Sequence, residues 1–431
     1  MKLFSHQEDV LKQLEHHNRC AMYLDMGLGK TYVGSEKAMS MGTDILLVCQ
    51  KSKIKDWIEH FFTYYIDKMK CDESGAWCYD LTKDTTFDMF QHSRYKVRIG
   101  VINYELAWRR KELLQLKDFT LMLDESSLIQ NIKAKQTKYI MKLQPSNVIL
   151  LSGTPISGKY ENLVTQANLL GWNISQEIYD KTYVNWKLTE DDGSGFRHKI
   201  VDKDDPYKNV ERLKDKLRKY GAVFMKTEDV LDLPEQNFIQ VMVDAPKEYK
   251  KFMKDDYIKL NDELELIGDT IFTKRLYARQ LCSQYNQNKI DALVDLIQST
   301  QDRLIIFYNF NAELDILKGI CDEQNRPYSE VNGSVKDLYH YEHSDSSISL
   351  IQFQAGAMGL NLQKCNKIIY FSLPERSELF EQSKKRIHRI GQSQSCFYYV
   401  MMARNTIERD IYETLEMRKD YTDELFKEGV K

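Results

Sequence analysis

The chain has 431 residues, of which 42% are hydrophobic and 29% are charged, and its formal net charge at pH 7 is −3. This length exceeds what one ordinary hydrophobic core organises, so we expect a soluble, globular protein of two domains with a smaller insertion. The small net charge excludes a global attraction to nucleic acid, and any such binding must come from local patches.

Features of secreted, membrane and zinc proteins are missing from the sequence. No apolar run approaches the ~20 residues that cross a bilayer, and the N-terminus has no apolar signal segment. Eight cysteines are scattered without the spacing of a zinc site or a disulfide framework, and the closest pair is Cys71 and Cys78. We therefore expect free thiols in a reducing compartment and no contact with a membrane.

The first predicted element is a helix over residues 3–16. Ser5 is followed three positions later by Glu8, which is the pattern of a capping box at a helix start. Gln7 lies in the first turn of this helix. From the pattern alone, Gln7 is a solvated residue of an amphipathic helix.

The stretch Leu24 to Thr31 precedes a second helical run. Gly27 and Gly29 allow a turn whose backbone N–H groups point at phosphate oxygens. Lys30 would supply positive charge to the β- and γ-phosphates, and the hydroxyl of Thr31 would bind Mg²⁺. The strict phosphate-loop pattern has glycine where this chain has leucine, so a glycine turn without a ligand fits the stretch about as well as a nucleotide site.

Short apolar runs predict the strands of a parallel sheet buried on both faces. A helix begun by Ser52 follows the first run, and Lys51 and Lys53 lie between them, where α/β proteins often contact ligands, although solvation also explains two lysines in a loop. The polar residues 66–96 are predicted as connecting structure. Strand and crossover recur often enough to predict a doubly wound sheet. The runs are residues 45–49, 97–104, 119–123 and 148–151.

The third run leads directly into Asp124-Glu125-Ser126-Ser127. An acidic pair at the end of a buried strand is costly to leave unpaired. In nucleotide hydrolases the first carboxylate holds Mg²⁺ and the second orients the attacking water. A helix cap followed by an acid in the first turn would explain the same residues without any catalytic role.

The middle of the chain separates two sheets. Residues 158–225 predict a helical insertion with a small aromatic core of its own, and residues 249–282 predict a charged helical segment. The aromatic residues of the insertion are Trp172, Tyr179, Tyr183 and Trp186, and a loop follows at Asp191 to Gly195.

A second sheet is predicted from strands at residues 303–308, 349–353 and 367–371, with a glycine-containing turn into a helix at residues 354–362. A helix from Glu378 to Gly391 would place Arg386 and Arg389 on one face, because they are three residues apart. Asn405 and Glu408 would open a final amphipathic helix.

In order and spacing, these segments resemble the motifs of superfamily 2 helicases, and within them those of Swi/Snf-type DNA translocase ATPases. The resemblance covers most of the chain, and its last motif, QSKKRIHRIGQ, is the closest match. The matching segments are Gln7, Asp25 to Thr31, Asp124 to Ser127, Leu151 to Pro155, Lys226 to Val230, Ala355 to Leu362 and Gln382 to Gln392.

The resemblance implies two RecA-like lobes of doubly wound parallel sheet, over residues 1–240 and 286–431, with a helical connector at 241–285. It implies ATP and Mg²⁺ as cofactors. The implied catalytic residues are Lys30, Asp124, Glu125, Arg386 and Arg389. The implied nucleotide-binding residues are Gln7, Gly27, Gly29, Lys30, Thr31, Gly359 and Asn361, with Thr31 and Asp124 on Mg²⁺. The implied nucleic-acid contacts are Lys51, Lys53, Asn103, Tyr104, Gln354 and Ala355.

The function that the resemblance implies is ATP-dependent translocation on double-stranded DNA, held by its backbone, with DNA-bound proteins as possible targets. A monomer in the cytoplasm of a bacterial or virus-infected cell is expected. A strand-separating DNA or RNA helicase and a DNA clamp with poor ATP hydrolysis are alternatives.

Two departures from the family pattern bear on mechanism. Leu24 replaces the first of two acids that usually precede Met26. Ser126-Ser127 replaces Ala-His and removes the histidine that links hydrolysis to the segment Leu151 to Pro155. We expect hydrolysis, and its coupling to movement stays open.

Overall fold

The computed structural model describes residues 2–66, 75–190, 197–261, 264–356 and 360–426. By their internal contacts, residues 1–230 with 420–431 form one compact unit, and residues 231–419 form another. We call them unit 1 and unit 2 and describe each by itself. The predicted domain boundaries at residues 240 and 285 do not coincide with this division and stay a prediction.

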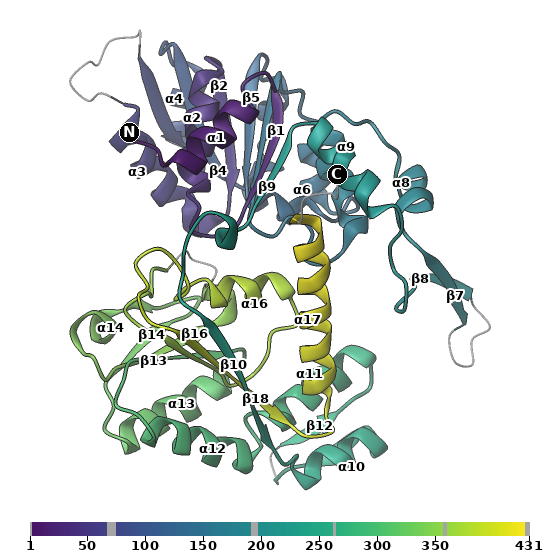
Figure 1. The fold of residues 1–431 in the computed structure, drawn as a ribbon, viewed down its shortest axis with the longest axis vertical. Helices are drawn as coiled ribbons and strands as arrows, with labels where there is room; N and C mark the ends of the chain where they lie inside the picture. Colours follow the sequence, from purple (N-terminus) through teal and green to yellow (C-terminus); the bar gives the residue numbers. More distant parts are fainter. Residues whose placement is uncertain (1, 67–74, 191–196, 262–263, 357–359, 427–431) are drawn as a thin grey trace. The chain divides into compact units, whose positions relative to one another are not determined.

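Unit 1 is built on a seven-stranded parallel sheet of order β3-β4-β2-β5-β6-β1-β9 (Figure 1). The central strands are buried along almost their whole length, as expected for a sheet covered on both faces. The doubly wound sheet is confirmed, and the four predicted strands are each correct to within one residue. The strands are β1 (Arg19–Leu24), β2 (Asp44–Cys49), β3 (Ala76–Asp80), β4 (Val97–Asn103), β5 (Phe119–Asp124), β6 (Asn147–Ser152) and β9 (Ala222–Met225).

Helices and one antiparallel hairpin complete unit 1. The helices are α1 (Ser5–Gln13), α2 (Lys30–Ser40), α3 (Ile54–Tyr64), α4 (Asp84–Gln91), α5 (Tyr104–Ala107), α6 (Lys135–Ile140), α7 (Val164–Leu169), α8 (Gln176–Tyr183) and α9 (Val210–Lys219), and the hairpin pairs β7 (Trp186–Glu190) with β8 (Arg197–Val201).

Two predicted helix starts in unit 1 are wrong. The residue before α1 is Phe4, whose backbone N–H donates to the side-chain oxygen of Gln7 at 3.0 Å, so Ser5 is not the cap. A 3₁₀ turn at Lys51–Lys53 leads into α3, and Ser52 lies inside that turn. In both cases a residue next to the expected serine occupies the cap position of the helix.

Residues 66–96 are more structured than predicted, because they contain β3 and α4. The insertion at 158–225 is also only partly helical, since it contains the β7/β8 hairpin and strand β9 of the main sheet. Its aromatic residues do not form a separate core. Trp172, Tyr179 and Tyr183 pack into the large hydrophobic core of unit 1, and Trp186 is 38% exposed. The predicted loop at Asp191 to Gly195 lies outside the described residues.

Unit 2 is built on a second seven-stranded sheet, of order β10-β18-β17-β13-β16-β14-β15, in which only the pair β14/β15 is antiparallel. Strands β10 and β18, far apart in the chain, run side by side over eight residues (Figure 1). The three predicted strands are correct to within one residue. The strands are β10 (Gln236–Val243), β13 (Leu304–Tyr308), β14 (Tyr328–Val331), β15 (Lys336–Asp337), β16 (Ile348–Gln352), β17 (Lys367–Tyr370) and β18 (Cys396–Ala403).

The segment 249–282, predicted as helical, holds a hairpin between its two helices. The remaining elements of the second half are α10 (Lys247–Asp255), the hairpin β11 (Tyr257–Lys259) and β12 (Glu265–Ile267), α11 (Ile271–Cys282), α12 (Gln287–Gln298), α13 (Asn311–Glu323), α14 (Tyr339–His343), α15 (Phe353–Gly356), α16 (Ser377–Lys384) and α17 (Ile407–Phe426).

Two helix predictions in unit 2 are wrong. The short helix α15 covers the start of the segment predicted as a glycine-containing turn, and the described residues from Leu360 on, where the helix was expected, are not helical. Helix α16 ends at Lys384, so Arg386 and Arg389 lie in the turns that follow it and not on a helix face. The final helix starts at Ile407, close to the predicted position, and its last residues belong to unit 1, where Phe426 packs on Phe224 with ring centroids 5.6 Å apart.

Over the described part of the chain, every helix is too short or too polar to cross a membrane. The seven cysteines within the described ranges are all buried and free. Cys71, which belongs to the closest cysteine pair in the sequence, lies outside those ranges.

Candidate nucleotide site

The loop between β1 and α2 has the backbone of a phosphate-binding turn. Gly27 and Gly29 have φ angles of 91° and 78°, in the left-handed region that glycine adopts without steric cost. Gly29 is the cap of the 11-residue helix α2, which begins at Lys30. The first N–H groups of a helix have no intrahelical partner, so the loop and helix start together offer donors to an anion beside the side chains of Lys30 and Thr31.

Lys30 folds back over this loop. Its Nζ donates to the backbone oxygens of Leu24 at 2.8 Å and Asp25 at 3.3 Å. A Cβ added to Gly153, in the segment after β6, would lie 3.2 Å from the same nitrogen. The ammonium group is therefore held between the loop and the end of β6, and the glycine at position 153 leaves room for it.

The segment after β9 also holds the phosphate loop in place. The hydroxyl of Thr227 donates to Asp25 Oδ2 at 2.9 Å and lies 3.2 Å from the backbone oxygen of Met26. The other oxygen of Asp25 accepts the backbone N–H of Met26 at 2.9 Å. The single acid that remains before Met26 thus fixes the loop to the segment that follows β9.

Gln7 packs on the loop and is not a solvated residue. Its side chain is 4% exposed and donates to the backbone oxygen of Leu28 at 3.1 Å. A Cβ on Gly29 would lie 2.1 Å from Gln7 Nε2, so a side chain there would displace the amide end of Gln7. This contact joins α1 to the phosphate loop.

Asp124 ends strand β5 close to this loop. Burial raises the pKa of its carboxyl, while a hydrogen bond from Trp57 Nε1 to Oδ2 at 2.7 Å and the charges of Lys53 and Lys30 act in the opposite direction. The hydroxyl of Tyr104 donates to the backbone oxygen of Asp124 at 3.0 Å. The acid is therefore held in a fixed orientation by two aromatic side chains.

Glu125 is held in an unusual backbone conformation, with a φ angle of 57°. A non-glycine residue there costs about 1–2 kcal/mol. Its Oε1 accepts from the hydroxyls of Ser152 at 2.8 Å and Ser127 at 3.0 Å. Burial raises the pKa of the Glu125 carboxyl, the nearby charge of Lys30 lowers it, and Asp124 raises it.

These contacts test the helix-cap interpretation of the acidic pair. Glu125 immediately precedes the 3₁₀ turn Ser126–Ile129, but its carboxylate accepts from two serine hydroxyls. Asp124 accepts from Trp57. Neither carboxylate caps the turn through a side-chain hydrogen bond, so the helix-cap interpretation is wrong, and the pair is a half-buried acidic centre beside Lys30. Two neighbouring, half-buried carboxyl groups offer the oxygen ligands that a divalent cation such as Mg²⁺ prefers.

The hydrogen bond from Trp57 gives a direct test of this centre. Replacing Trp57 by phenylalanine removes the donor and should raise the pKa of Asp124 further, because the bond stabilises the carboxylate. A hydrogen bond to a charged group contributes about 1.5 kcal/mol, so the acidic limb of the kcat/KM profile for ATP should move to higher pH by about one unit. Trp77→Phe, in β3, is the matched control and should leave the profile in place. An unchanged profile in Trp57→Phe would contradict the role of this bond.

The predicted nucleic-acid contacts of unit 1 fall in two groups. Lys51 and Lys53 lie in the turn after β2, where Lys53 pairs with Asp56 at 2.8 Å. Asn103 and Tyr104 are 7% and 1% exposed, and the amide of Asn103 donates to a neighbouring glutamate. In this arrangement Tyr104 orients Asp124, and the predicted contact of both buried residues with nucleic acid stays a prediction.

In unit 2 the structure brings the two predicted arginines next to the glycine-containing segment. The backbone N–H of Leu362 donates to the oxygen of Arg386 at 3.0 Å, and Arg389 Nη1 lies 3.5 Å from the backbone oxygen of Leu360. Gln392 Nε2 donates to the backbone oxygen of Cys365 at 2.9 Å. Burial lowers the pKa of the Arg389 guanidinium from its ordinary value.

The other predicted site residues of unit 2 differ in their solvent exposure. Asn361 and Gln354 are exposed, Ala355 is buried, and Gly359 lies outside the described residues. His388 Nε2 donates to the backbone oxygen of Pro234 at 2.9 Å, which ties the turns that follow α16 to the start of unit 2. Their predicted roles toward nucleotide and nucleic acid stay predictions.

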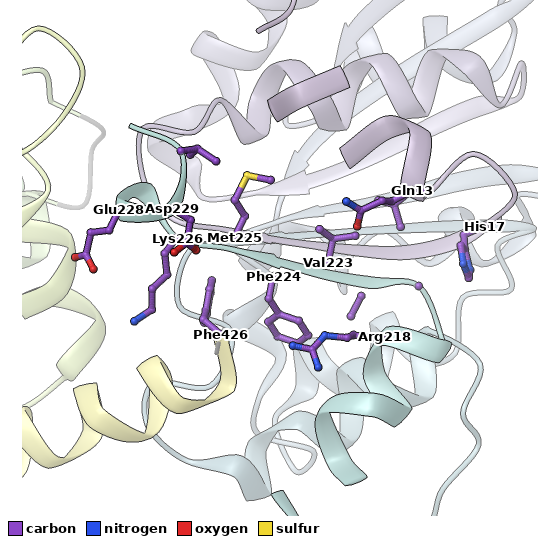
Figure 2. A pocket seen from close by; sticks show the side chains of 14 residues that line it. Gln13, His17, Arg218, Val223, Phe224, Met225, Lys226, Glu228, Asp229 and Phe426 are labelled. Carbon is purple, nitrogen blue, oxygen red and sulfur yellow. Dashed lines mark hydrogen bonds between the residues drawn. The ribbon is translucent and has the colours of Figure 1, made fainter. Parts of the chain in front are cut away.

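A pocket of about 880 Å³ lies along strand β9 in unit 1 (Figure 2). It extends from Gln13 and His17 to Asp229, with Phe224 and Phe426 on one side. Its lining residues, all in the described chain, differ from those predicted to bind ATP. The nucleotide site is therefore defined by the loop and the acidic pair.

Sequence reasoning missed the residues that hold this site in place. Each of them contacts a residue that is far away in the sequence. These residues are Trp57, Ser152, Gln166 and Thr227. For Ser152 and Thr227 the signal was their place in motif-like segments, and for the other two the sequence carries no local signal.

Comparison with known families matches both halves of the chain. The SNF2-related domain matches residues 6–288, and the helicase conserved C-terminal domain matches residues 288–391. Among relatives, ISWI chromatin-remodeling complex ATPase ISW2 of Saccharomyces cerevisiae is 22% identical over 92% of this chain and 38% of its own length. The uncharacterized ATP-dependent helicase YqhH of Bacillus subtilis is 23% identical over 95% of this chain and 77% of its own length.

The first relatives are longer proteins, of which the chain spans about a third to a half. A solved structure, the Sulfolobus solfataricus SWI2/SNF2 ATPase core in complex with dsDNA, is similar with a TM-score of 0.44 and 18% identity, over 98% of this chain and 92% of that chain.

Proposed function

The chain belongs to the SNF2-related family of ATP-dependent helicases, and from that premise we propose that it is a translocase that uses ATP to move along double-stranded DNA. The observation that carries the proposal is the position of Lys30, which is held between the glycine loop and the end of β6 and acts electrostatically on the half-buried pair Asp124 and Glu125. A phosphate-binding loop beside two acids is the arrangement that phosphoryl transfer to water needs.

In this proposal the residues of unit 1 bind and orient ATP. The loop amides and Lys30 bind the phosphates of ATP. Gln7 supports the part of the loop that contacts the nucleoside of ATP. Thr31 and Asp124 would hold Mg²⁺, whose charge stabilises the phosphate oxygens as negative charge develops on them. Glu125 accepts the proton of the attacking water, for which a pKa raised by burial is suitable.

The arginines of unit 2 complete the chemistry in this proposal. Arg389, with Arg386 beside it in the chain, would stabilise the charge on the transferred phosphate, as arginine fingers do. Binding and loss of the γ-phosphate would then change the relation between the units, and a chemical cycle would become a displacement along DNA.

Lys51, Lys53 and Gln354 are the proposed contacts with the DNA backbone, because they are charged or polar and not buried. Binding through phosphates predicts little sequence preference and a strong dependence on salt. The predicted monomeric state, cytoplasmic location and action on DNA-bound proteins stay predictions.

One observation weighs against the alternative of a clamp with poor hydrolysis. That alternative rested on Ser126-Ser127, but Ser127 donates to the carboxylate of Glu125 and so supports the proposed base. The remaining alternative is a strand-separating helicase.

A displacement assay separates these functions. We expect ATP-dependent release of a third strand from a DNA triplex and no separation of a forked duplex. Separation of the fork without triplex release would instead support a helicase, and DNA binding without ATP turnover would support a clamp.

A further inference from the structure

Gln166 lies at the centre of a buried hydrogen-bond network in unit 1. It is on helix α7 and is fully buried. Its Oε1 accepts from the hydroxyls of Ser126 at 2.7 Å and Tyr23 at 3.0 Å, and its Nε2 donates to the backbone oxygen of Pro155 at 2.8 Å. The side chain thus joins three segments that are distant in the chain.

The chemistry of these partners fixes the orientation of the amide. The carbonyl of Pro155 can only accept, so the NH₂ group of Gln166 must face it. The amide oxygen then faces two hydroxyl groups, each of which has a hydrogen to donate. Ser126 and Tyr23 are themselves fully buried, so loss of one partner would leave polar atoms without water to replace it.

The three segments are the ones that carry the proposed chemistry. Tyr23 is at the end of β1, directly before the phosphate loop. Ser126 follows Glu125, and Pro155 follows Ser152, whose hydroxyl donates to the Glu125 carboxylate. Glu125 is therefore fixed at both ends: its carboxylate is held by Ser127 and Ser152, and its strained backbone is held by the next residue through Gln166.

We propose that Gln166 is a positioning residue for Glu125, and that it joins the acidic segment Asp124 to Ser127 to the segment Ser152 to Pro155 where the sequence lacks the usual histidine. A displacement of either segment would change the position of the other through this amide. The proposal rests on the proposed ATPase function, and it gives a testable route for the coupling that Ser126-Ser127 leaves open.

A buried glutamine that only stabilises the fold would make the same contacts, so the test needs a readout that stability does not change. Three variants form the set: Gln166→Leu, Ser126→Ala and the double variant. Gln130→Ala is the matched control, because Gln130 lies in the same region but bonds to Ser157 and Asn162. For each variant we would measure kcat and KM for ATP with duplex DNA, the ATP consumed per triplex released, and the melting temperature.

For Gln166→Leu we expect kcat to fall by about 10- to 100-fold, as for a displaced catalytic group, with KM for ATP within about twofold of wild type, and more ATP consumed per triplex released. Ser126→Ala should lower kcat less, and adding it to Gln166→Leu should cause no further loss, because both remove one link. Gln130→Ala should behave as wild type in kcat and coupling.

Wild-type kcat and coupling in Gln166→Leu would overturn the proposal, as would losses in the double variant that simply add. If Gln166→Leu does not fold, Ser126→Ala and Tyr23→Phe decide, since each removes one hydroxyl: normal kcat and coupling in both would overturn it. A wild-type chain without DNA-stimulated ATP turnover would refute the proposed function itself, which is a different result from an active wild type that is insensitive at Gln166.

Discussion

Replacing Glu125 by glutamine should lower the maximal rate of ATP hydrolysis by about 10²- to 10⁴-fold, the usual contribution of a general base. Glutamine keeps the length of the side chain and an oxygen that can accept from Ser152 and Ser127. It cannot take a proton from water. ATP affinity should therefore remain close to that of wild type, and a filter-binding or fluorescence titration with ATP would measure it beside the steady-state rate.

The same variant should fold at least as well as wild type. Burial raises the pKa of Glu125, so the folded chain favours the neutral acid. That contribution to stability is present below the unfolded pKa and is lost as pH rises through the folded pKa. A neutral glutamine does not suffer this loss, and we expect its melting temperature at neutral pH to be equal or higher. Glu177→Gln, an exposed position in α8, is the matched control and should leave turnover unchanged. Wild-type turnover in Glu125→Gln would contradict the assignment.

Replacing Arg389 by alanine should reduce DNA-stimulated ATP turnover by about 10³- to 10⁵-fold, which is the range for an arginine finger. The side chain lies in the loop after α16, with Nη1 3.5 Å from the backbone oxygen of Leu360. Arg389→Lys keeps the charge but not the planar fork of donors, and it should recover little of the rate. Steady-state ATP hydrolysis with saturating duplex DNA is the measurement.

Arg409→Ala is the matched control for that variant, because Arg409 lies in α17 and pairs with Glu413 at 2.8 Å on an exposed face. It should retain wild-type turnover. Full DNA-stimulated ATPase in Arg389→Ala would show that this arginine has no part in the chemistry, and Arg386 would be the next residue to replace.

The parts of the fold that the sequence predicts are those specified by local pattern. Buried parallel strands such as β2, β5 and β6 are continuous apolar runs, and both glycines of the phosphate loop have the positive φ angles that their position requires. Strand β3 was missed because it is an edge strand that is only half buried, so its apolar character is weak.

Other features depend on contacts between distant residues, which a local pattern cannot show. Helix α16 was expected to continue to Gly391, but it ends at Lys384, whose backbone oxygen accepts the hydroxyl of Tyr398 from strand β18 at 3.1 Å. Trp57 and Asp124 are 67 residues apart in the chain. Gln166 lies in a segment that was predicted as a helical insertion, but its side chain contacts the acidic segment.

Translocation on double-stranded DNA is tested most directly by the rate of ATP hydrolysis under four conditions: without nucleic acid, with duplex DNA, with single-stranded DNA and with RNA. The three nucleic acids are compared at equal concentrations of their nucleotide residues. We expect duplex DNA to stimulate the rate far more than single-stranded DNA or RNA, and we expect added salt to weaken this stimulation because its ions compete with the protein for the DNA phosphates. A rate that none of the nucleic acids changes, or that RNA or single strands raise most, would contradict translocation on double-stranded DNA.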